Sequence, residues 1–266
     1  MRSFKFSNLP IRLQLIALAI LLILPALGIV IHTGLKERKD DYRKATIESQ
    51  RLADSLAAEQ ENIMDEARQL GSLLAELPDV INRNTDKVQS IISNTVTKNP
   101  QFKIILITDA EGMVWASSTP FTPPLSLAER RHFKNARATK SFSSGEFLIG
   151  SISKHPVFPT AYPIIDHNVF KGVVIISWDL DVLKSILQRS QLPYDSNYIF
   201  TDHKGIIISR GSESGRNVGE PMLSADLKKM ESGPERDTYE FSRADGSRRI
   251  VTYRKLRLDG EKTPYM

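Results

Sequence analysis

The chain has 266 residues, of which 41% are hydrophobic, enough to build packed cores in one large domain or two ordinary ones. The absence of cysteine excludes a disulfide framework, a thiolate nucleophile and a cysteine-based zinc site. The formal net charge of +5 comes from scattered lysines and arginines without a basic helix interleaved with aromatic residues, so we predict that the chain binds no nucleic acid.

An apolar segment near the N-terminus predicts one transmembrane helix. Every residue from Leu15 to Ile31 is apolar, Gly or Pro, and Ile11 and Leu13 extend the segment to about the length that spans a bilayer. Only basic charges precede it, whereas both signs follow it, and this asymmetry places the N-terminus in the cytoplasm. A cleaved signal peptide is the alternative, but the segment is long for a signal core and lacks a small-x-small cleavage site.

The segment from Lys36 to Leu70 is rich in helix-forming residues and predicts a single stalk helix of roughly 50 Å. Four apolar residues recur along it at near-heptad spacing and can pack against the chain's own domain or against a second protomer. These residues are Leu52, Leu56, Ile63 and Leu70. A shorter helix is predicted in "TDKVQSIISNTV", and Pro100 ends it.

From Phe102 the pattern changes to strands. The runs "FKIILIT" and "MVWASS" are joined by Asp109-Ala110-Glu111-Gly112, which fits a type I turn. The spacing Ser126-x-x-Glu129 predicts a capping box and a helix that begins there and includes Arg130 to Ala138. Three strands are then expected in "EFLIGSISK", "VFPTAYPIID" and "FKGVVIISWDL", followed by a helix in "DVLKSILQRS".

A second unit repeats this order. "YIFTDHKGIIISR" matches "ILITDAEGMVWAS" with Thr-Asp-x-x-Gly at the centre of both, and a short helix over Ser224 to Met230 and a hairpin about Ala244-Asp245-Gly246 follow. The repeat indicates a duplicated domain. The second copy lacks the terminal strand and closing helix of the first, so we expect the chain to be a fragment whose second module is incomplete.

Motifs for catalysis, metal binding or cofactor binding are absent from the sequence. The five histidines do not have zinc-ligand spacing, and neither a glycine-rich phosphate loop nor a Gly-x-Ser-x-Gly elbow occurs. Asp179-Leu180-Asp181 is not followed by the further oxygen ligands of a calcium loop. We predict no catalytic residue, no metal and no cofactor, and an anchored hydrolase is therefore the weakest hypothesis.

The order of these segments resembles the double Cache (dCache) family of extracytoplasmic sensor domains. The residues that carry the resemblance are "ILITDAEGMVWASS", "ERRHFKNA", "GEFLIGSISKHPVFPTAYPIID", "GVVIISWDLDVL" and "YIFTDHKGIIIS". The resemblance implies an α+β fold of two tandem PAS-like modules with antiparallel sheets. The expected segments are a cytoplasmic N-terminus (1–10), the transmembrane helix (11–33), the stalk and second helix (34–98), a membrane-distal module (99–190) and an incomplete membrane-proximal module (191–266).

The membrane-distal module of this family usually holds a small-molecule ligand, and the sequence allows such a pocket. Arg130 and Arg131 lie at the start of the predicted helix, where free backbone amides and the helix dipole favour an anion such as a carboxylate. Asp179, at the end of the last strand, can receive an ammonium group, order Arg130 or cap the next helix.

In amino-acid-binding members, an Arg on this helix, an aromatic pair after it and an Asp at the end of this strand carry recognition. The resemblance therefore implies ligand contacts by Arg130, His132, Phe133 and Asp179, although His132 stands where an indole is expected and Leu125 where a tyrosine is expected. Strand alternation can point Trp115 and Tyr162 into the same pocket or into the core, and Phe133 is most simply a core residue.

The resemblance implies the input region of a membrane receptor. A sensor histidine kinase is favoured, with a diguanylate cyclase or a chemoreceptor as alternatives. A membrane-tethered extracytoplasmic binding protein without signalling output is the hypothesis from another class. We expect a carboxylate-bearing small-molecule ligand, a homodimer formed through the stalk, and a location in the inner membrane with the sensor region periplasmic or extracellular.

Overall fold

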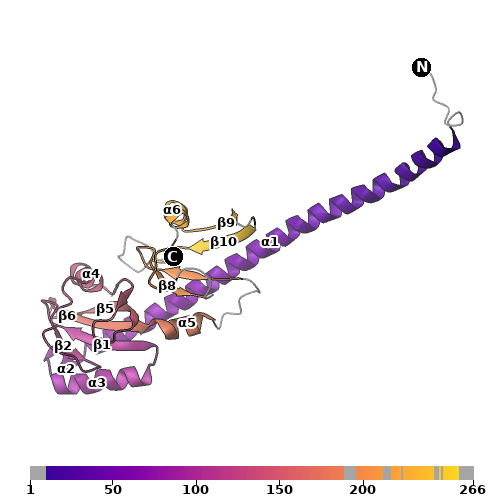
Figure 1. Cartoon of the computed structure of the whole chain (residues 1–266). Coiled ribbons are helices and arrows are strands. Elements are labelled where there is room, and N and C mark those ends of the chain that lie inside the picture. Colours follow the sequence, from indigo (N-terminus) through magenta and orange to yellow (C-terminus); the bar gives the residue numbers. More distant parts are fainter. Residues whose placement is uncertain are drawn as a thin grey trace.

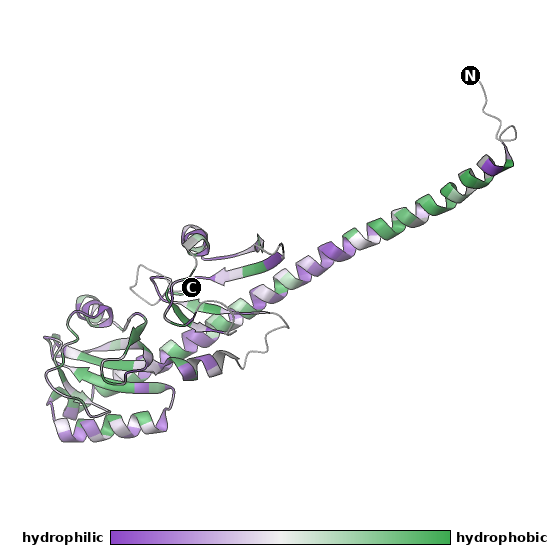
Figure 2. Ribbon diagram, in the orientation of Figure 1, coloured by the Kyte–Doolittle hydropathy of each residue, from purple (hydrophilic) through white to green (hydrophobic). Residues whose placement is uncertain are grey.

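The computed structural model describes residues 10–188, 196–211, 217–222, 224–242, 246 and 248–257. A single helix, α1 (Ile11–Ala75), runs from the N-terminal end of the described chain to the larger of its sheets (Figure 1). It continues through Pro25 and through Gly71, five residues beyond the predicted end at Leu70. An 18-residue window in its N-terminal half has a mean hydropathy of 1.9 and is 0% buried, so this part is long and apolar enough to cross a membrane (Figure 2).

A six-stranded antiparallel sheet packs against the C-terminal part of α1. Its order is β2-β1-β6-β5-β3, with β4 also paired to β5. The long central strands β5 and β6 match the predicted runs "VFPTAYPIID" and "FKGVVIISWDL" to within one residue at each end. The elements of this unit are α2 (Pro78–Ile81), α3 (Thr85–Lys98), β1 (Phe102–Thr108), β2 (Val114–Ser117), α4 (Arg131–Thr139), β3 (Ser143–Ser144), β4 (Leu148–Ile149), β5 (Pro156–Asp166), β6 (Val169–Asp179) and α5 (Leu180–Gln188).

Both faces of this sheet are buried, because its strands alternate between two apolar clusters. On one face, Ile105, Ile176 and Trp178 pack with residues of α1 and α3. On the other face, Ile104 and Ile175 pack with residues of α4. We call these the stalk face and the α4 face. The central strands therefore contain long apolar runs in place of a strict alternation of apolar and polar residues.

Two local predictions were wrong. The predicted capping box does not form: α4 begins at Arg131, Arg130 is its N-cap residue, and no side chain caps it. Ser126 instead pairs with Met113 in an isolated bridge next to β2, and the Glu129 carboxylate pairs with Lys134 at 2.5 Å. The backbone at Ser126 is thus already extended against the sheet, which prevents a helix from starting there.

The run "EFLIGSISK" is not one strand. Only Leu148–Ile149 pairs with β5, and the residues after Gly150 form a turn closed by backbone hydrogen bonds from Gly150 N to His155 O and from Lys154 N to Gly150 O. Lys154 has a positive φ of 57°, which a strand does not allow. The turn covers part of the α4 face.

The second unit consists of two hairpins and a helix that lie along α1 between the larger sheet and the apolar segment (Figure 1). The hairpins are separate two-stranded sheets, β7-β8 and β9-β10. Of the turn predicted about Ala244-Asp245-Gly246, only Gly246 lies within the described residues. The elements are β7 (Ile199–Thr201), β8 (Ile207–Arg210), α6 (Ser224–Ser232), β9 (Arg236–Ser242) and β10 (Arg248–Arg254). The mixed α+β fold with antiparallel sheets is as predicted.

Candidate functional site

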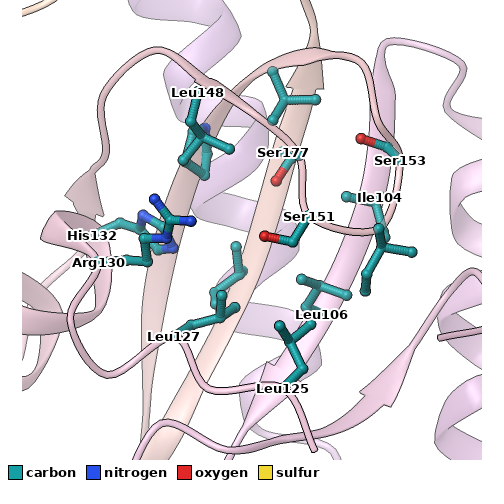
Figure 3. A pocket seen from close by; sticks show the side chains of 15 residues that line it. Ile104, Leu106, Leu125, Leu127, Arg130, His132, Leu148, Ser151, Ser153 and Ser177 are labelled. Atoms are coloured by element: carbon teal, nitrogen blue, oxygen red, sulfur yellow. The ribbon is translucent and has the colours of Figure 1, made fainter. Parts of the chain in front are cut away.

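A small cavity that is partly open to solvent lies on the α4 face of the larger sheet (Figure 3). Its floor is formed by β1, β5 and β6, and its walls by the loop before α4 and the turn after β4. Most of its lining side chains are aliphatic. The lining residues are Ile104, Leu106, Leu125, Leu127, Arg130, His132, Leu148, Gly150, Ser151, Ile152, Ser153, Val157, Pro159, Ile175 and Ser177.

The N-terminus of α4 lies at this cavity, because its N-cap residue Arg130 and its second residue His132 both line it. Because no side chain caps α4, its first-turn amides and the positive end of its helix dipole are left to interact with the cavity. The Arg130 guanidinium extends into the space that Ser151 and Ser177 also face (Figure 3). Within the described chain, the guanidinium has no hydrogen bond or ion pair.

His132 is the second polar group at this end of α4. Its side chain is 3% exposed, and neither ring nitrogen has a hydrogen-bond partner among the residues that the structure describes. Burial, and to a smaller extent the Arg130 guanidinium, lowers the pKa of His132 to about 3, so the ring is neutral at pH 7. A buried ring with two unsatisfied nitrogens is costly, and a ligand in the cavity can satisfy one of them.

The cavity residues that the sequence prediction missed come mainly from the turn after β4 and from strand residues on the α4 face. Ser151 and Ser153 belong to the run predicted as a strand, and Ser177 lies on β6 between apolar residues. Gly150 followed by alternating serines was the available signal, because Gly and Ser favour turns. The aliphatic lining gave no signal, since its members look like ordinary core residues.

Asp179 does not line the cavity, although it comes two residues after Ser177 on β6 and pairs in register with the lining residue Val157. Its Oδ2 lies 2.9 Å from Lys103 Nζ, and its Oδ1 accepts a 3.0 Å hydrogen bond from the Asp181 amide at the start of α5. Both carboxylate oxygens therefore already have partners. No sequence pattern singles out Lys103.

The three predicted aromatic site residues lie elsewhere. Phe133 is 1% exposed and packs edge-on to Phe170, with 6.1 Å between ring centroids, which anchors α4 to the sheet. Trp115 and Tyr162 pack with the cluster on the stalk face. A Cβ atom on Gly71 of α1 would lie 2.7 Å from Tyr162 Cβ, so Tyr162 directly contacts the stalk helix. Of the six predicted site residues, the structure brings Arg130 and His132 together.

The wall of the cavity is linked to the second unit. A Cβ on Gly145 would lie 3.0 Å from His132 Nδ1, and two residues later the Phe147 amide donates a 3.1 Å hydrogen bond to Asp202 Oδ2 in the turn between β7 and β8. Beside this bond, the Glu146 carboxylate forms an ion pair with Lys204. The second Thr-Asp-x-x-Gly turn therefore contacts the segment that packs behind His132.

His203 lies in the same contact, with its Nε2 4.0 Å from Glu146 Oε2. Burial and the Arg131 guanidinium lower the pKa of His203, against opposing effects of Asp202 and Glu146. No group of three or more His, Asp or Glu side chains that could hold a metal ion occurs among the residues described. The site thus offers one guanidinium, one neutral imidazole, three hydroxyls and an aliphatic wall, which suits reversible binding of a small anion.

Comparison with known proteins places this geometry in context. A family model described as a Cache domain, dCache_1, matches residues 38–265. Sporulation kinase D of Bacillus subtilis (strain 168) is 29% identical over 118 residues, which are 43% of this chain and 23% of that protein. The chain therefore matches less than a quarter of the length of this curated relative.

Two solved structures have the same fold at low sequence identity. The sensor domain of the V. cholerae histidine kinase DctB superimposes with a TM-score of 0.59 at 15% identity, covering 85% of this chain and 96% of the other. The ligand-binding domain of the Pseudomonas fluorescens chemoreceptor CtaA, solved in complex with L-serine, gives a TM-score of 0.61 at 16% identity, covering 86% and 95%. At these identities the likeness concerns the fold alone.

Proposed function

The chain belongs to the double Cache family of sensor domains, and from this premise we propose that it is the extracytoplasmic input region of a membrane-bound receptor that binds a small carboxylate in the cavity at the N-terminus of α4. We further propose that the larger sheet and its helices, within 99–190, form the membrane-distal module and that the hairpins within 191–266 belong to the membrane-proximal one. This division places the ligand site at the end of α1 that lies away from the apolar segment.

One observation carries the binding proposal. The unpaired guanidinium of Arg130 and the unpaired ring of His132 meet at an uncapped helix N-terminus, inside a cavity whose other lining groups are aliphatic or hydroxyl. A carboxylate satisfies this set, because it can accept a forked pair of hydrogen bonds from Arg130 and one from the His132 ring. It also complements the positive end of the α4 dipole.

The test is the thermal unfolding of the full chain in lipid nanodiscs, followed by fluorescence of its two tryptophans, with a panel of small carboxylates and amines. A carboxylate that binds the folded chain raises the midpoint, and the stabilisation grows with the logarithm of its concentration once that concentration exceeds its Kd. We expect Arg130→Ala to weaken that carboxylate by about tenfold or more, because a charge-assisted hydrogen bond is lost. Arg137→Ala, an exposed site on the same helix, is the matched control and should bind normally.

The proposal fails if no carboxylate raises the unfolding midpoint. It fails equally if Arg130→Ala binds as well as Arg137→Ala.

The apolar part of α1 supports a further proposal on topology. We infer that residues 11–33 cross the inner membrane with the N-terminus in the cytoplasm and the sheets in the periplasm or outside the cell. Alkaline phosphatase, which is active only outside the cytoplasm, should be active when fused after residue 75 at the end of α1. Activity of a cytoplasmic reporter at the same position would reverse the orientation.

We propose homodimerisation as part of the receptor role, with a sensor histidine kinase as the favoured output and a diguanylate cyclase or chemoreceptor as alternatives. The structure assigns Ile63, predicted as a possible dimer contact, to the chain's own core, and Leu56 and Leu70 pack against the same cluster. Ile63 is therefore not available to a dimer interface, whereas Leu52 lies outside this cluster and is partly exposed. Light scattering of the detergent-solubilised chain tests the oligomeric state, and a monomer would contradict the proposal.

A further inference from the structure

The charges of the cavity-lining side chains restrict the ligand to a narrower class than carboxylates in general. Among its described lining residues, Arg130 is the only charged side chain, and the His132 ring is neutral at pH 7. The lining that the structure describes contains no aspartate and no glutamate. A ligand that carries an ammonium group would bury it in this cavity without an opposite charge, which is strongly unfavourable.

An acidic group on the cavity face of the sheet, Asp179, already has other partners. Asp179 lies one alternation beyond Ser177, so its side chain starts from the same face. Lys103 Nζ holds one of its oxygens at 2.9 Å, and the α5 amide of Asp181 holds the other at 3.0 Å. The Asp179 side chain is only 13% exposed, so this pairing is partly shielded from water and is not easily exchanged for a ligand ammonium.

The remaining lining defines the body of the ligand. Arg130 and His132 lie together on one side of the cavity in Figure 3, and leucines and isoleucines from β1, β6 and the flanking loops form much of the rest. A compact aliphatic or aromatic group fits such a wall, because transfer of apolar surface from water onto aliphatic side chains is favourable.

We propose that the cavity selects a monocarboxylate with an apolar body and without an amino group, and that Lys103 withholds Asp179 from ligand recognition. This proposal rests on the proposed binding function of the same cavity. Lys103 acts as a specificity-determining residue without touching the ligand. Its ammonium forms an ion pair with the Asp179 carboxylate, which would otherwise be available to the ammonium group of an amino-acid ligand.

Two matched ligand pairs test the selectivity directly. L-Leucine and 4-methylpentanoate differ only in the ammonium group, as do L-phenylalanine and 3-phenylpropanoate. Isothermal titration calorimetry on the full chain in nanodiscs should show at least one of the two acids binding about tenfold tighter than its amino acid or more, because the ammonium is buried unpaired. The amide 4-methylpentanamide reports whether the carboxylate itself is needed, and we expect it not to bind detectably.

Variants of the Lys103–Asp179 pair test the role of Lys103. In Lys103→Met, which keeps length and removes charge, the freed Asp179 should improve amino-acid affinity about fivefold or more and weaken the matching acid, because an unpaired carboxylate attracts ammonium and repels a carboxylate. Lys171→Met is the matched control. Lys171 lies on β6, at the end opposite to Asp179, and its Nζ likewise forms an ion pair, with Asp166 Oδ2 at 3.8 Å. This change should alter neither affinity.

A third variant keeps the test valid if Lys103→Met does not fold. Asp179→Asn should leave acid binding within about twofold of the wild type, because in this proposal the ligand does not contact that carboxylate. A wild-type preference for the amino acid over its matching acid would overturn the inference while leaving the binding function of the cavity in place. Failure of all four ligands, together with failure of the wider carboxylate panel, would overturn the binding function as well.

Discussion

At the residue scale, the burial of His132 makes the stability of the folded chain depend on pH. Its ring is neutral in the folded chain because protonation would bury a charge beside Arg130. In the unfolded chain the same residue regains its ordinary pKa of 6.5. Below pH 6.5, therefore, His132 binds a proton in the unfolded chain, whereas in the folded chain it binds one only as the pH approaches its lowered pKa of about 3.

The first prediction follows from this difference. As the pH falls from 6.5 toward 3, His132 should cost stability with a slope of at most about 1.4 kcal/mol per pH unit. Replacement by a side chain that does not titrate, His132→Gln, should reduce this slope, whereas His155→Gln, at an exposed loop position, should not reproduce the reduction. Urea unfolding at a series of pH values measures both slopes, and equal slopes in wild type and His132→Gln would contradict the prediction.

The twin turns allow a second prediction with an internal control. Asp109 and Asp202 each accept two turn amides with one oxygen, but only Asp202 also accepts the Phe147 amide with its other oxygen. Asn can replace the first oxygen and cannot replace the second, because its amide nitrogen donates and does not accept. Asp202→Asn should therefore lose about 1–3 kcal/mol of unfolding free energy.

Asp109→Asn should lose less, because it keeps its turn and breaks no contact between the two units among the residues that the structure describes. Denaturant unfolding of the two variants side by side measures the difference. A loss in Asp109→Asn equal to that in Asp202→Asn would show that the turn, and not the contact between units, is the source.

At the element scale, the contact between α1 and the larger sheet depends on a glycine inside the helix. Gly71 lies within α1, where glycine is normally unfavourable, and the Tyr162 side chain on β5 occupies the space that a Cβ atom would need. We predict that Gly71→Ala destabilises the chain by about 1–3 kcal/mol, because overpacking moves the helix off the sheet. Gly34→Ala, on the same helix with open space around it, should be neutral or stabilising.

Thermal unfolding of the two variants is the measurement. The interpretation would be wrong if alanine at Gly71 raised the unfolding midpoint as it should at Gly34.

The elements were largely predictable from the sequence, because periodicity and composition are local properties. The run "FKIILIT" is β1 residue for residue, and the stalk was predicted as one helix because proline and glycine are rare in it. The start of α4 was not predictable, since the bridge between Ser126 and Met113 is a tertiary contact that overrides a local capping pattern.

The cavity was less predictable for the same reason. Arg130 and His132 could be found from their place near a helix start. Asp179 was predicted as a ligand contact from its place at a strand end and from the family resemblance; its partner Lys103 lies 76 residues earlier, and no sequence pattern connects the two. Tyr162 could equally have faced the cavity, and only the strand register, which places its neighbours Thr160 and Ile164 on the same face, assigns it to the stalk.

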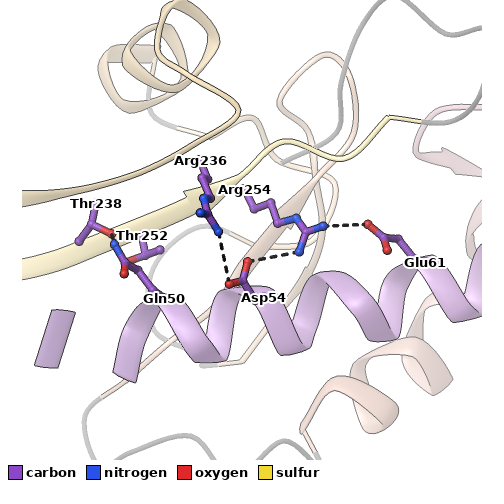
Figure 4. A network of polar contacts seen from close by, with 7 residues as sticks. All are labelled: Gln50, Asp54, Glu61, Arg236, Thr238, Thr252 and Arg254. Carbon is purple, nitrogen blue, oxygen red and sulfur yellow. Dashed lines mark hydrogen bonds and ion pairs between the residues drawn. The ribbon is translucent and has the colours of Figure 1, made fainter. Parts of the chain in front are cut away.

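At the scale of the whole molecule, α1 also holds the second unit through polar contacts (Figure 4). Arg254 of β10 donates to Asp54 Oδ1 and to Glu61 Oε1, each at 3.2 Å, and Arg236 Nη1 lies 3.9 Å from Asp54 Oδ2. Gln50 Nε2 donates to Thr238 Oγ1 at 3.1 Å. These side chains are partly exposed, so these polar contacts are weaker and more salt-sensitive than the apolar packing of the larger sheet on the same helix.

The fourth prediction concerns this attachment. Arg254→Gln should increase hydrogen exchange in β9 and β10 without changing exchange in β5 and β6, because it removes two ion pairs to α1 and leaves the larger sheet untouched. High salt should produce part of the same change in the wild type. Arg248→Gln, which removes an ion pair within the hairpin to Glu240, is the control. Equal protection of β9 and β10 in Arg254→Gln and the wild type would show that the ion pairs do not hold the hairpin.

Because α1 is one uninterrupted helix, it fixes the relative rotation of the units attached to it as well as the distance between them. The hairpin is fixed at Asp54 and Glu61 and the larger sheet at Gly71, so one residue inserted between Glu61 and Gly71 would rotate the two attachments by about 100° relative to each other. The Asp202–Phe147 hydrogen bond spans the same two units and tolerates no such rotation. Insertions before Ser49 change the distance and the rotation between the sheets and the apolar segment but leave the two attachments in register with each other. Natural variation in stalk length should therefore accumulate on that side.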